Sequence, residues 1–133
     1  MKLIHNSLYQ AALAPRGITV SLQSPSQGTS LQRWTFADQP VIKIGRCAHN
    51  DIVLHSSVVS RYHLEARRIA THWKIINFGN NGTYLDGQPI TEAIVRDGMI
   101  IRLAISGPQL QIQLGSVVPN SRLKNELRKE LVN

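Results

Sequence analysis

Three short polar segments of this chain carry side chains that are suited to holding an anion. They are Gly45-Arg46, Ser60-Arg61 and Asn80-Asn81. An arginine presents a planar fork of donors that matches phosphate oxygens. A serine hydroxyl can donate to a further oxygen, and an asparagine carries both a donor and an acceptor, as a peptide main chain does. Together these groups suit a tetrahedral dianion held beside an extended peptide.

The polar segments lie between stretches that have the pattern of β-strands. Residues 18–23 and 110–114 alternate apolar and polar side chains, which is the period of a half-buried strand. Asp86-Gly87, between Leu85 and Pro89-Ile90, predicts a tight hairpin, because both central turn positions need positive φ. Further strands are expected at 34–36, 41–44, 51–54, 63–70, 72–77, 83–85 and 99–104. We therefore predict an all-β fold, a two-sheet β-sandwich of about ten or eleven short strands.

The order of the polar segments along the chain matters for the predicted site. Loops of a sandwich gather at its two ends, and alternate loops share an end. Arg46, Ser60 and Asn81 each lie in a loop between two predicted strands. If these are alternate loops, all three lie at the same end of the sandwich and can converge. The predicted anion site depends on that convergence.

The two ends of the chain differ from the sandwich, which is expected to span residues 17–118. Residues 1–16 have mixed character and are expected to form an N-terminal arm. Leu123, Leu127 and Leu131 are spaced four apart, as on one face of a helix. Residues 119–133 are therefore expected to form a basic C-terminal helical tail or linker. This short helix could dock on the sandwich, contact a partner or lead into a further segment, and the favoured interpretation is a solvated or loosely docked tail.

Composition and motifs argue against several classes of function. The 133 residues include 15 Lys and Arg against 8 Asp and Glu, a formal charge of +7, and only 5% are aromatic. The charge suits nucleic acid or a phosphorylated protein, but no cluster of aromatic residues is available to stack on single-stranded nucleic acid. The chain has neither a Gly-x-x-x-x-Gly-Lys phosphate loop nor a Gly-x-Ser-x-Gly nucleophile motif, and its five histidines lack metal-site spacing. We therefore expect no catalytic residue, no metal and no cofactor.

The sequence carries no sign of export or membrane insertion. No apolar run is long enough to span a bilayer, and the polar residues Lys2, His5 and Asn6 do not fit a signal peptide. The single cysteine, Cys47, excludes an internal disulfide framework and suits a reducing compartment. These features predict a cytoplasmic location.

Several motifs follow one another in order between residues 41 and 90. They are Gly45-Arg46, Asn50-Asp51-Ile52-Val53-Leu54, Val59-Ser60-Arg61-Tyr62-His63, Trp73 and Asn81-Gly82-Thr83-Tyr84-Leu85-Asp86-Gly87. Each motif alone occurs by chance, but their order and spacing together closely resemble the forkhead-associated (FHA) domain. The flanking strands fit the two-sheet sandwich of that family.

The resemblance implies a domain that recognises phosphothreonine peptides through loops at one end of the sandwich. Arg46 and Ser60 match the positions that bind the phosphate. Arg61 matches a position at the rim, where it would touch the phosphate or the peptide backbone. Asn81 matches the residue that bonds the peptide main chain beside the phosphorylated residue. The family distinguishes phosphothreonine from phosphoserine by a small apolar niche for the extra methyl group.

Other matched positions would support the site or depart from the family pattern. Gly45 and Gly82 match positions where a side chain would obstruct a loop, and His63 matches a histidine that braces the loops without touching the ligand. The family commonly has Ser or Thr where this chain has Asn80. The Asn80 amide can still donate a hydrogen bond to a phosphate, but its reach differs.

Each of these residues also has an interpretation without a ligand. Ser60 could bond its own backbone in a turn, and Arg61 could pair with Asp51 or Glu65 on the surface. We favour a non-enzymatic module that mediates phosphorylation-dependent protein–protein interaction in signalling, with a phosphothreonine-containing protein or peptide as its partner. The alternatives are a phosphate-independent scaffold or oligomerisation domain, prompted by Asn80, and, less favoured, nucleic-acid binding. The sequence leaves the oligomeric state open.

Overall fold

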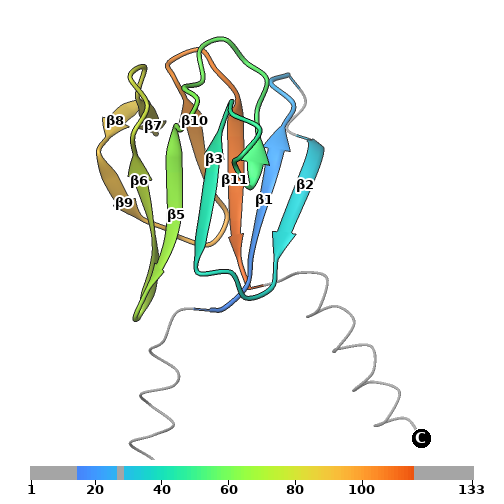
Figure 1. Cartoon of the computed structure of the whole chain (residues 1–133), viewed down its shortest axis with the longest axis vertical. Helices are drawn as coiled ribbons and strands as arrows, with labels where there is room; N and C mark the ends of the chain where they lie inside the picture. Colours follow the sequence, from blue (N-terminus) through green and yellow to red (C-terminus); the bar gives the residue numbers. More distant parts are fainter. Residues whose placement is uncertain (1–14, 27–28, 116–133) are drawn as a thin grey trace, which may run out of the picture.

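The computed structural model describes residues 15–26 and 29–115, and these residues form eleven β-strands in two sheets (Figure 1). The strands are β1 (Ile18–Gln23), β2 (Ser30–Phe36), β3 (Val41–Gly45), β4 (Ile52–Val53), β5 (Leu64–Ile69), β6 (His72–Asn77), β7 (Thr83–Leu85), β8 (Gln88–Ile90), β9 (Glu92–Ile94), β10 (Met99–Leu103) and β11 (Gln109–Leu114). The predicted all-β sandwich is confirmed. The expected C-terminal helix and residues 1–14 of the expected arm lie outside the described residues.

The two sheets enclose one apolar core. The six-stranded sheet has the order β2-β1-β11-β10-β7-β8, and the five-stranded sheet has the order β4-β3-β5-β6-β9. Alternate side chains of the central strands point between the sheets, because successive residues of a strand face opposite sides. The completely buried apolar residues include Ile18, Val20, Ile42, Ile44, Trp73, Ile75, Leu110 and Ile112. This packing fixes the strands whose ends carry the polar loops.

Several predicted elements agree closely with the structure. The predicted strands 72–77 and 83–85 coincide with β6 and β7. Asp86 and Gly87 have φ values of +52° and +78°, as the predicted two-residue hairpin requires, and they join Leu85 to its partner Gln88.

The sequence pattern does not predict β9, which is only three residues long and too short for a clear alternation. β8 is the second strand of the predicted hairpin, which the sequence places at Pro89-Ile90. β8 also contains Pro89, which cannot donate to a sheet, and it occupies the edge of the six-stranded sheet, where proline is tolerated.

The two ends of the described chain lie at one end of the sandwich, and the polar loops lie at the other (Figure 1). Gly115 donates its main-chain N–H to the carbonyl of Gly17 at 2.8 Å, which holds the first and last described segments side by side. The indole N–H of buried Trp73 donates to the carbonyl of Pro15 at 2.7 Å. No helix in residues 15–26 or 29–115 is long and apolar enough to cross a membrane.

Candidate functional site

The three polar loops meet at one end of the sandwich. The Arg46 main-chain N–H donates to the Ser60 carbonyl at 3.0 Å, which joins the loop after β3 to the loop before β5. The Asn80 main-chain N–H donates to Ser60 Oγ at 3.2 Å, and Asn81 Nδ2 donates to the Val58 carbonyl at 3.0 Å. The loop after β6 is thereby bonded to the same segment. The predicted convergence of the loops is present in the structure.

Arg46 is exposed, and its guanidinium is oriented by one bond. Its Nε donates to the Val59 carbonyl at 3.1 Å. That bond uses one of the five guanidinium N–H groups and leaves the two terminal nitrogens available to a ligand. Within the described part of the chain Arg46 forms no ion pair. A guanidinium held through Nε loses little side-chain entropy when it binds an oxyanion.

Ser60 lies at the centre of the three loops. Its carbonyl binds Arg46 and its Oγ accepts a hydrogen bond from the Asn80 main chain. Because a hydroxyl can accept and donate at the same time, the Ser60 O–H remains able to donate to an anion. The structure thus gives Asn80 a role through its main chain, which tethers the loop to Ser60.

Arg61 is exposed beside this group, and it pairs with neither of the acids considered as its partners. Asp51 accepts hydrogen bonds from Gln39 Nε2 and the Lys43 main chain, and Glu65 is paired with Arg67 at 2.6 Å. The Arg61 carbonyl accepts the main-chain N–H of Cys47 at 3.1 Å. The backbone of Arg61 is therefore fixed while its side chain stays at the rim.

His63 joins two of the loops from inside the protein. It is completely buried, its Nδ1 accepts the Ser60 main-chain N–H at 3.0 Å, and its Nε2 lies 2.8 Å from the Gly82 carbonyl. Since a carbonyl can only accept, the proton is on Nε2 and the ring is neutral. Burial lowers the pKa of His63 below its usual value, although the Gly82 carbonyl acts in the opposite direction.

Two glycines permit the close approach of the loops. A Cβ on Gly45 would overlap the Arg61 carbonyl and come within 2.9 Å of Asn50 Nδ2. A Cβ on Gly79 would lie 2.5–2.6 Å from three atoms of the His63 ring. Neither site has room for a side chain, so both glycines are required by packing.

Gly82 is needed for its backbone conformation. Its φ is +82°, a region that L residues with side chains rarely adopt. This conformation aims the Gly82 carbonyl at His63, and the ring of Tyr84 packs beside it. The preceding residue, Asn81, uses Nδ2 on Val58 and keeps its Oδ1 available to accept an N–H from a peptide.

Two asparagines that the motif roles did not single out also hold the loops. Asn50 Nδ2 donates to the Cys47 carbonyl at 2.9 Å and to the Arg61 carbonyl at 2.7 Å. Asn77 Oδ1 accepts bonds from the Gly79 main chain and from the buried Thr83 hydroxyl. In a sequence, an asparagine near the end of a strand is only a weak signal of such bonds. For Gly79, the only signal is that the residue is a glycine.

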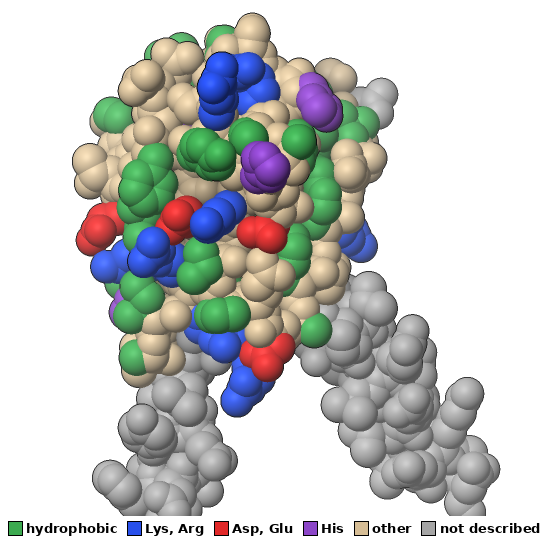
Figure 2. Space-filling view, in the orientation of Figure 1, with side chains coloured by type: hydrophobic (Ala, Val, Ile, Leu, Met, Phe, Trp, Pro, Cys, Tyr) green, Lys and Arg blue, Asp and Glu red, His purple; other side chains and the backbone are tan. Residues whose placement is uncertain are grey.

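The electrostatic character of this end is cationic. The loop segments 46–51, 54–63, 78–82 and 104–108 contain Arg46 and Arg61 and one acidic residue, Asp51, whose carboxylate is bonded to Gln39 and to the Lys43 main chain. In Figure 2 basic side chains lie at this end, whereas the acidic ones lie lower on the face shown. The main-chain N–H of His49, the Tyr62 hydroxyl and the charge of Arg61 lower the pKa of the Cys47 thiol at the rim. Among residues 15–26 and 29–115 no group of His, Cys, Asp and Glu is arranged to hold a metal ion.

The sandwich and its loops are similar to those of a known family. Residues 42–104 match the family model of the FHA domain. It is similar to the oxoglutarate dehydrogenase inhibitor of Corynebacterium diphtheriae, with 28% identity over 103 residues, 72% of this chain and 69% of that protein.

Solved structures of FHA proteins are also similar to this chain. The FHA-1 domain of Mycobacterium tuberculosis Rv1747 superposes with a TM-score of 0.64 and 27% identity, covering 77% of this chain and 99% of that one. Mycobacterium tuberculosis EmbR, solved in complex with a low-affinity phosphopeptide, has a TM-score of 0.60 and 26% identity, covering 74% of this chain and 25% of EmbR.

Proposed function

We propose that this domain binds phosphothreonine segments of a partner protein and thereby makes a protein–protein interaction depend on phosphorylation. The observation that carries the proposal is the meeting of Arg46, Ser60 and Asn81, from three separate loops, at an end where neither Arg46 nor Arg61 forms an ion pair within the described residues. The match to the FHA family model and similarity to EmbR, which was solved with a phosphopeptide, support it.

The phosphate is bound by groups whose free donors face solvent. The terminal nitrogens of Arg46 donate to two phosphate oxygens, and the Ser60 hydroxyl donates to another. Arg61 adds positive charge at the rim. Because a phosphothreonine carries a charge near −2, these charge-assisted bonds separate it strongly from an unmodified threonine.

The peptide main chain is bound beside the phosphate. Asn81 keeps Nδ2 on the Val58 carbonyl and accepts a peptide N–H with Oδ1. The bonds that already hold the loops reduce the ordering that binding requires. The Asn80 side chain extends from a loop tethered to Ser60 and supplies an amide donor at the edge of the phosphate.

Titration of a peptide in its threonine-phosphorylated and unphosphorylated forms tests the proposal. We expect the phosphorylated form to bind at least about tenfold more tightly, since each bond to a charged group contributes about 1.5–3 kcal/mol. Arg46→Ala should remove most of this difference without changing the unfolding transition. Arg33→Ala is the matched control, because Arg33 is also exposed but lies on β2 of the six-stranded sheet.

Two outcomes would contradict the proposal. Equal binding of both peptide forms by the unaltered protein would favour a phosphate-independent scaffold. Retention of the difference in a folded Arg46→Ala protein would mean that the phosphate is bound elsewhere.

A further inference from the structure

A groove of about 580 Å³ opens on one side of the sandwich, between the edges of the two sheets. Its walls come from the β7–β8 hairpin and β10 of one sheet, from β9 of the other, and from the loop that joins β9 to β10. β7 pairs with residues 101–103 of β10, so among the described residues Met99 and Ile100 have no neighbouring strand on that side. The groove therefore lies along an uncovered stretch of sheet edge.

Side chains of the core reach this groove from inside. Leu85 lies opposite Ile101 and Met99 lies opposite Ile112, and both partners are completely buried. Because residues opposite each other share a face of the sheet, Leu85 and Met99 also point inward, yet both are only partly buried. Ile94, which also lines the groove, is 56% exposed. Covering these side chains with another apolar group is favourable, because apolar area is removed from water.

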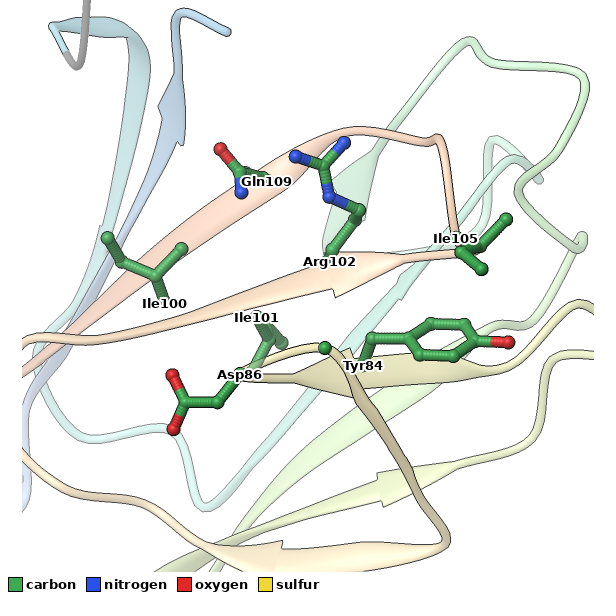
Figure 3. Close-up of a pocket in the computed structure, with 8 residues that line it drawn as sticks. Tyr84, Asp86, Ile100, Ile101, Arg102, Ile105 and Gln109 are labelled. Atoms are coloured by element: carbon green, nitrogen blue, oxygen red, sulfur yellow. The ribbon is translucent and has the colours of Figure 1, made fainter.

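The border of the groove carries two acidic side chains. Asp86 and Asp97 both line it, and neither forms an ion pair within the described residues. Asp97 Oδ1 accepts the Leu114 main-chain N–H at 2.8 Å, which leaves Oδ2 available. Figure 3 shows the adjoining face of the sheet, where the Asp86 carboxylate points away from the basic side chain of Arg102. Among the described residues that line the groove Arg96 alone is basic, so the lining suits a basic segment.

The described chain ends beside this groove. The bond between Asp97 and Leu114 ties the β9–β10 loop to the last residue of β11. The Gly98 main-chain N–H also donates to the Ile112 carbonyl at 2.7 Å. A chain extends by up to about 3.3–3.6 Å per residue, so the residues that follow β11 can reach every part of the groove. Their attachment at its border gives them a high effective concentration there, and a modest contact suffices to hold them.

The C-terminal tail, residues 119–133, has the sequence pattern that this groove fits. Its apolar residues recur at every fourth position, as on one face of a helix: Leu123, Leu127 and Leu131. Its basic side chains outnumber its acidic ones, with Arg122, Lys124, Arg128 and Lys129 against Glu126 and Glu130. The tail thus combines an apolar face with a positive charge, and the groove combines apolar side chains with acidic ones.

We propose that the C-terminal tail folds back into this groove as an intramolecular ligand. Its leucines cover Leu85 and Met99, and its basic side chains approach Asp86 and Asp97. The contact closes the open side of the sandwich and stabilises the domain. The groove meets the end of the sandwich from which the chain leaves, opposite to the polar loops (Figure 1), so the inference is independent of the proposed phosphopeptide binding.

Paramagnetic relaxation in the full chain tests where the tail lies. A nitroxide is attached to Asn125→Cys in a Cys47→Ser background. Position 125 is two residues from both Leu123 and Leu127 and therefore lies off their face of the predicted helix. We expect selective broadening of the amide signals of the residues that line the groove, and not of those on β2. Broadening centred on another surface, or none, would overturn the proposal.

Thermal unfolding of the full chain measures the contact. Leu123→Ser combined with Leu127→Ser should lower the melting temperature by about 4–8 °C. The same tail change should have a much smaller effect in an Ile94→Ser background, because the groove has already lost part of its apolar wall. Leu31→Ser is the matched control, since Leu31 is 63% exposed but lies on β2. Full additivity of the tail change with Ile94→Ser would show that the two do not touch.

Two other results would also contradict the inference. If sedimentation shows a dimer that Ile94→Ser abolishes, a second copy occupies the groove in place of the tail. If the leucine substitutions in the tail change the affinity for a phosphothreonine peptide, the tail contacts the other end of the sandwich. We expect a monomer and an unchanged affinity.

Discussion

At the scale of single residues, the packing of Gly79 against His63 is the tightest constraint on the candidate site. The ring of His63 occupies the space that a side chain at position 79 would need. The ring also holds the main chains of Ser60 and Gly82, which belong to two different loops. A change at Gly79 therefore acts on the site through His63, even though Gly79 itself is assigned no contact with a ligand.

We expect Gly79→Ala to lower the free energy of unfolding by about 1–3 kcal/mol, the usual cost of an overpacked core position. Urea unfolding monitored by tryptophan fluorescence measures it. In a His63→Ala background the ring is gone, so the same substitution should cost much less, and the two effects should not add. Full additivity would show that the cost arises from the backbone of Gly79 rather than from the ring.

At the residue scale the sequence already identified most of the groups that the structure brings together. Arg46, Ser60, Asn81 and His63 follow from motif order. Asn50 and Gly79 do not, because their importance lies in contacts with residues distant in the chain. The site roles assigned to Arg46, Ser60, Arg61, Asn80 and Asn81 stay predictions until a ligand is tested.

At the scale of elements, the loop before β5 and the loop after β6 are connected mainly through His63 and Ser60. The His63 ring can accept from the Ser60 main chain only while Nδ1 is unprotonated. Protonation of the ring would replace this acceptor with a donor and would place a charge in a buried position. Lowering the pH should therefore weaken the connection that His63 makes between the two loops.

This connection predicts a pH dependence of stability. The pKa of His63 is lowered by burial, so the unfolded chain takes up the proton at a higher pH than the folded protein does. The contribution of neutral His63 is fully present above about pH 6.5, the unfolded value. It should be lost progressively as the pH falls from there through the lower folded pKa.

Urea unfolding at a series of pH values measures this effect, with His63→Gln as the comparison. Glutamine offers an acceptor and a donor but does not titrate in this range. The stability of the unaltered protein should fall more steeply with acid below about pH 6.5 than that of the variant. Parallel curves for the two proteins would contradict the assignment.

The strands show where sequence patterns are reliable and where they are not. β6 and β7 are predicted residue for residue, because alternation and turn signals bound them clearly. β8 is predicted only as the second arm of the Asp86-Gly87 hairpin, and β9 is missed, because three residues do not make a pattern. These short strands lie at sheet edges and are stabilised by the partners that the fold supplies.

At the scale of the whole molecule, the candidate site and the two ends of the described chain lie at opposite ends of the sandwich (Figure 1). Trp73 anchors the first described residue through its indole N–H. Beside it, Arg68 lies 5.9 Å above the Trp73 ring and bonds both the Arg16 carbonyl and Asp38. Pro15 and Arg16, which lead into β1, are therefore bonded to the sandwich.

We expect Trp73→Phe to destabilise the protein by about 1–3 kcal/mol, because the Pro15 carbonyl loses its donor and the smaller ring leaves a cavity. Thermal and urea unfolding measure this change. The affinity for a phosphopeptide should not change, since the anchor is at the far end of the sandwich. Trp34→Phe is the control, as Trp34 is only partly buried at the edge of the core. An equal loss in both variants would rule out a special role for the Trp73 bond.

The sequence alone determined the β-sandwich, most of its strands and the polar residues of three loops, because alternation, turn residues and motif order are local properties of the chain. Tertiary structure decided which atoms of those residues are engaged. It bonds Asn80 to Ser60 through the main chain, fits Gly79 against His63 and packs the Tyr84 ring beside Gly82. These relations depend on distances of a few ångströms between residues far apart in sequence, and only the packing of two sheets around one core sets such distances.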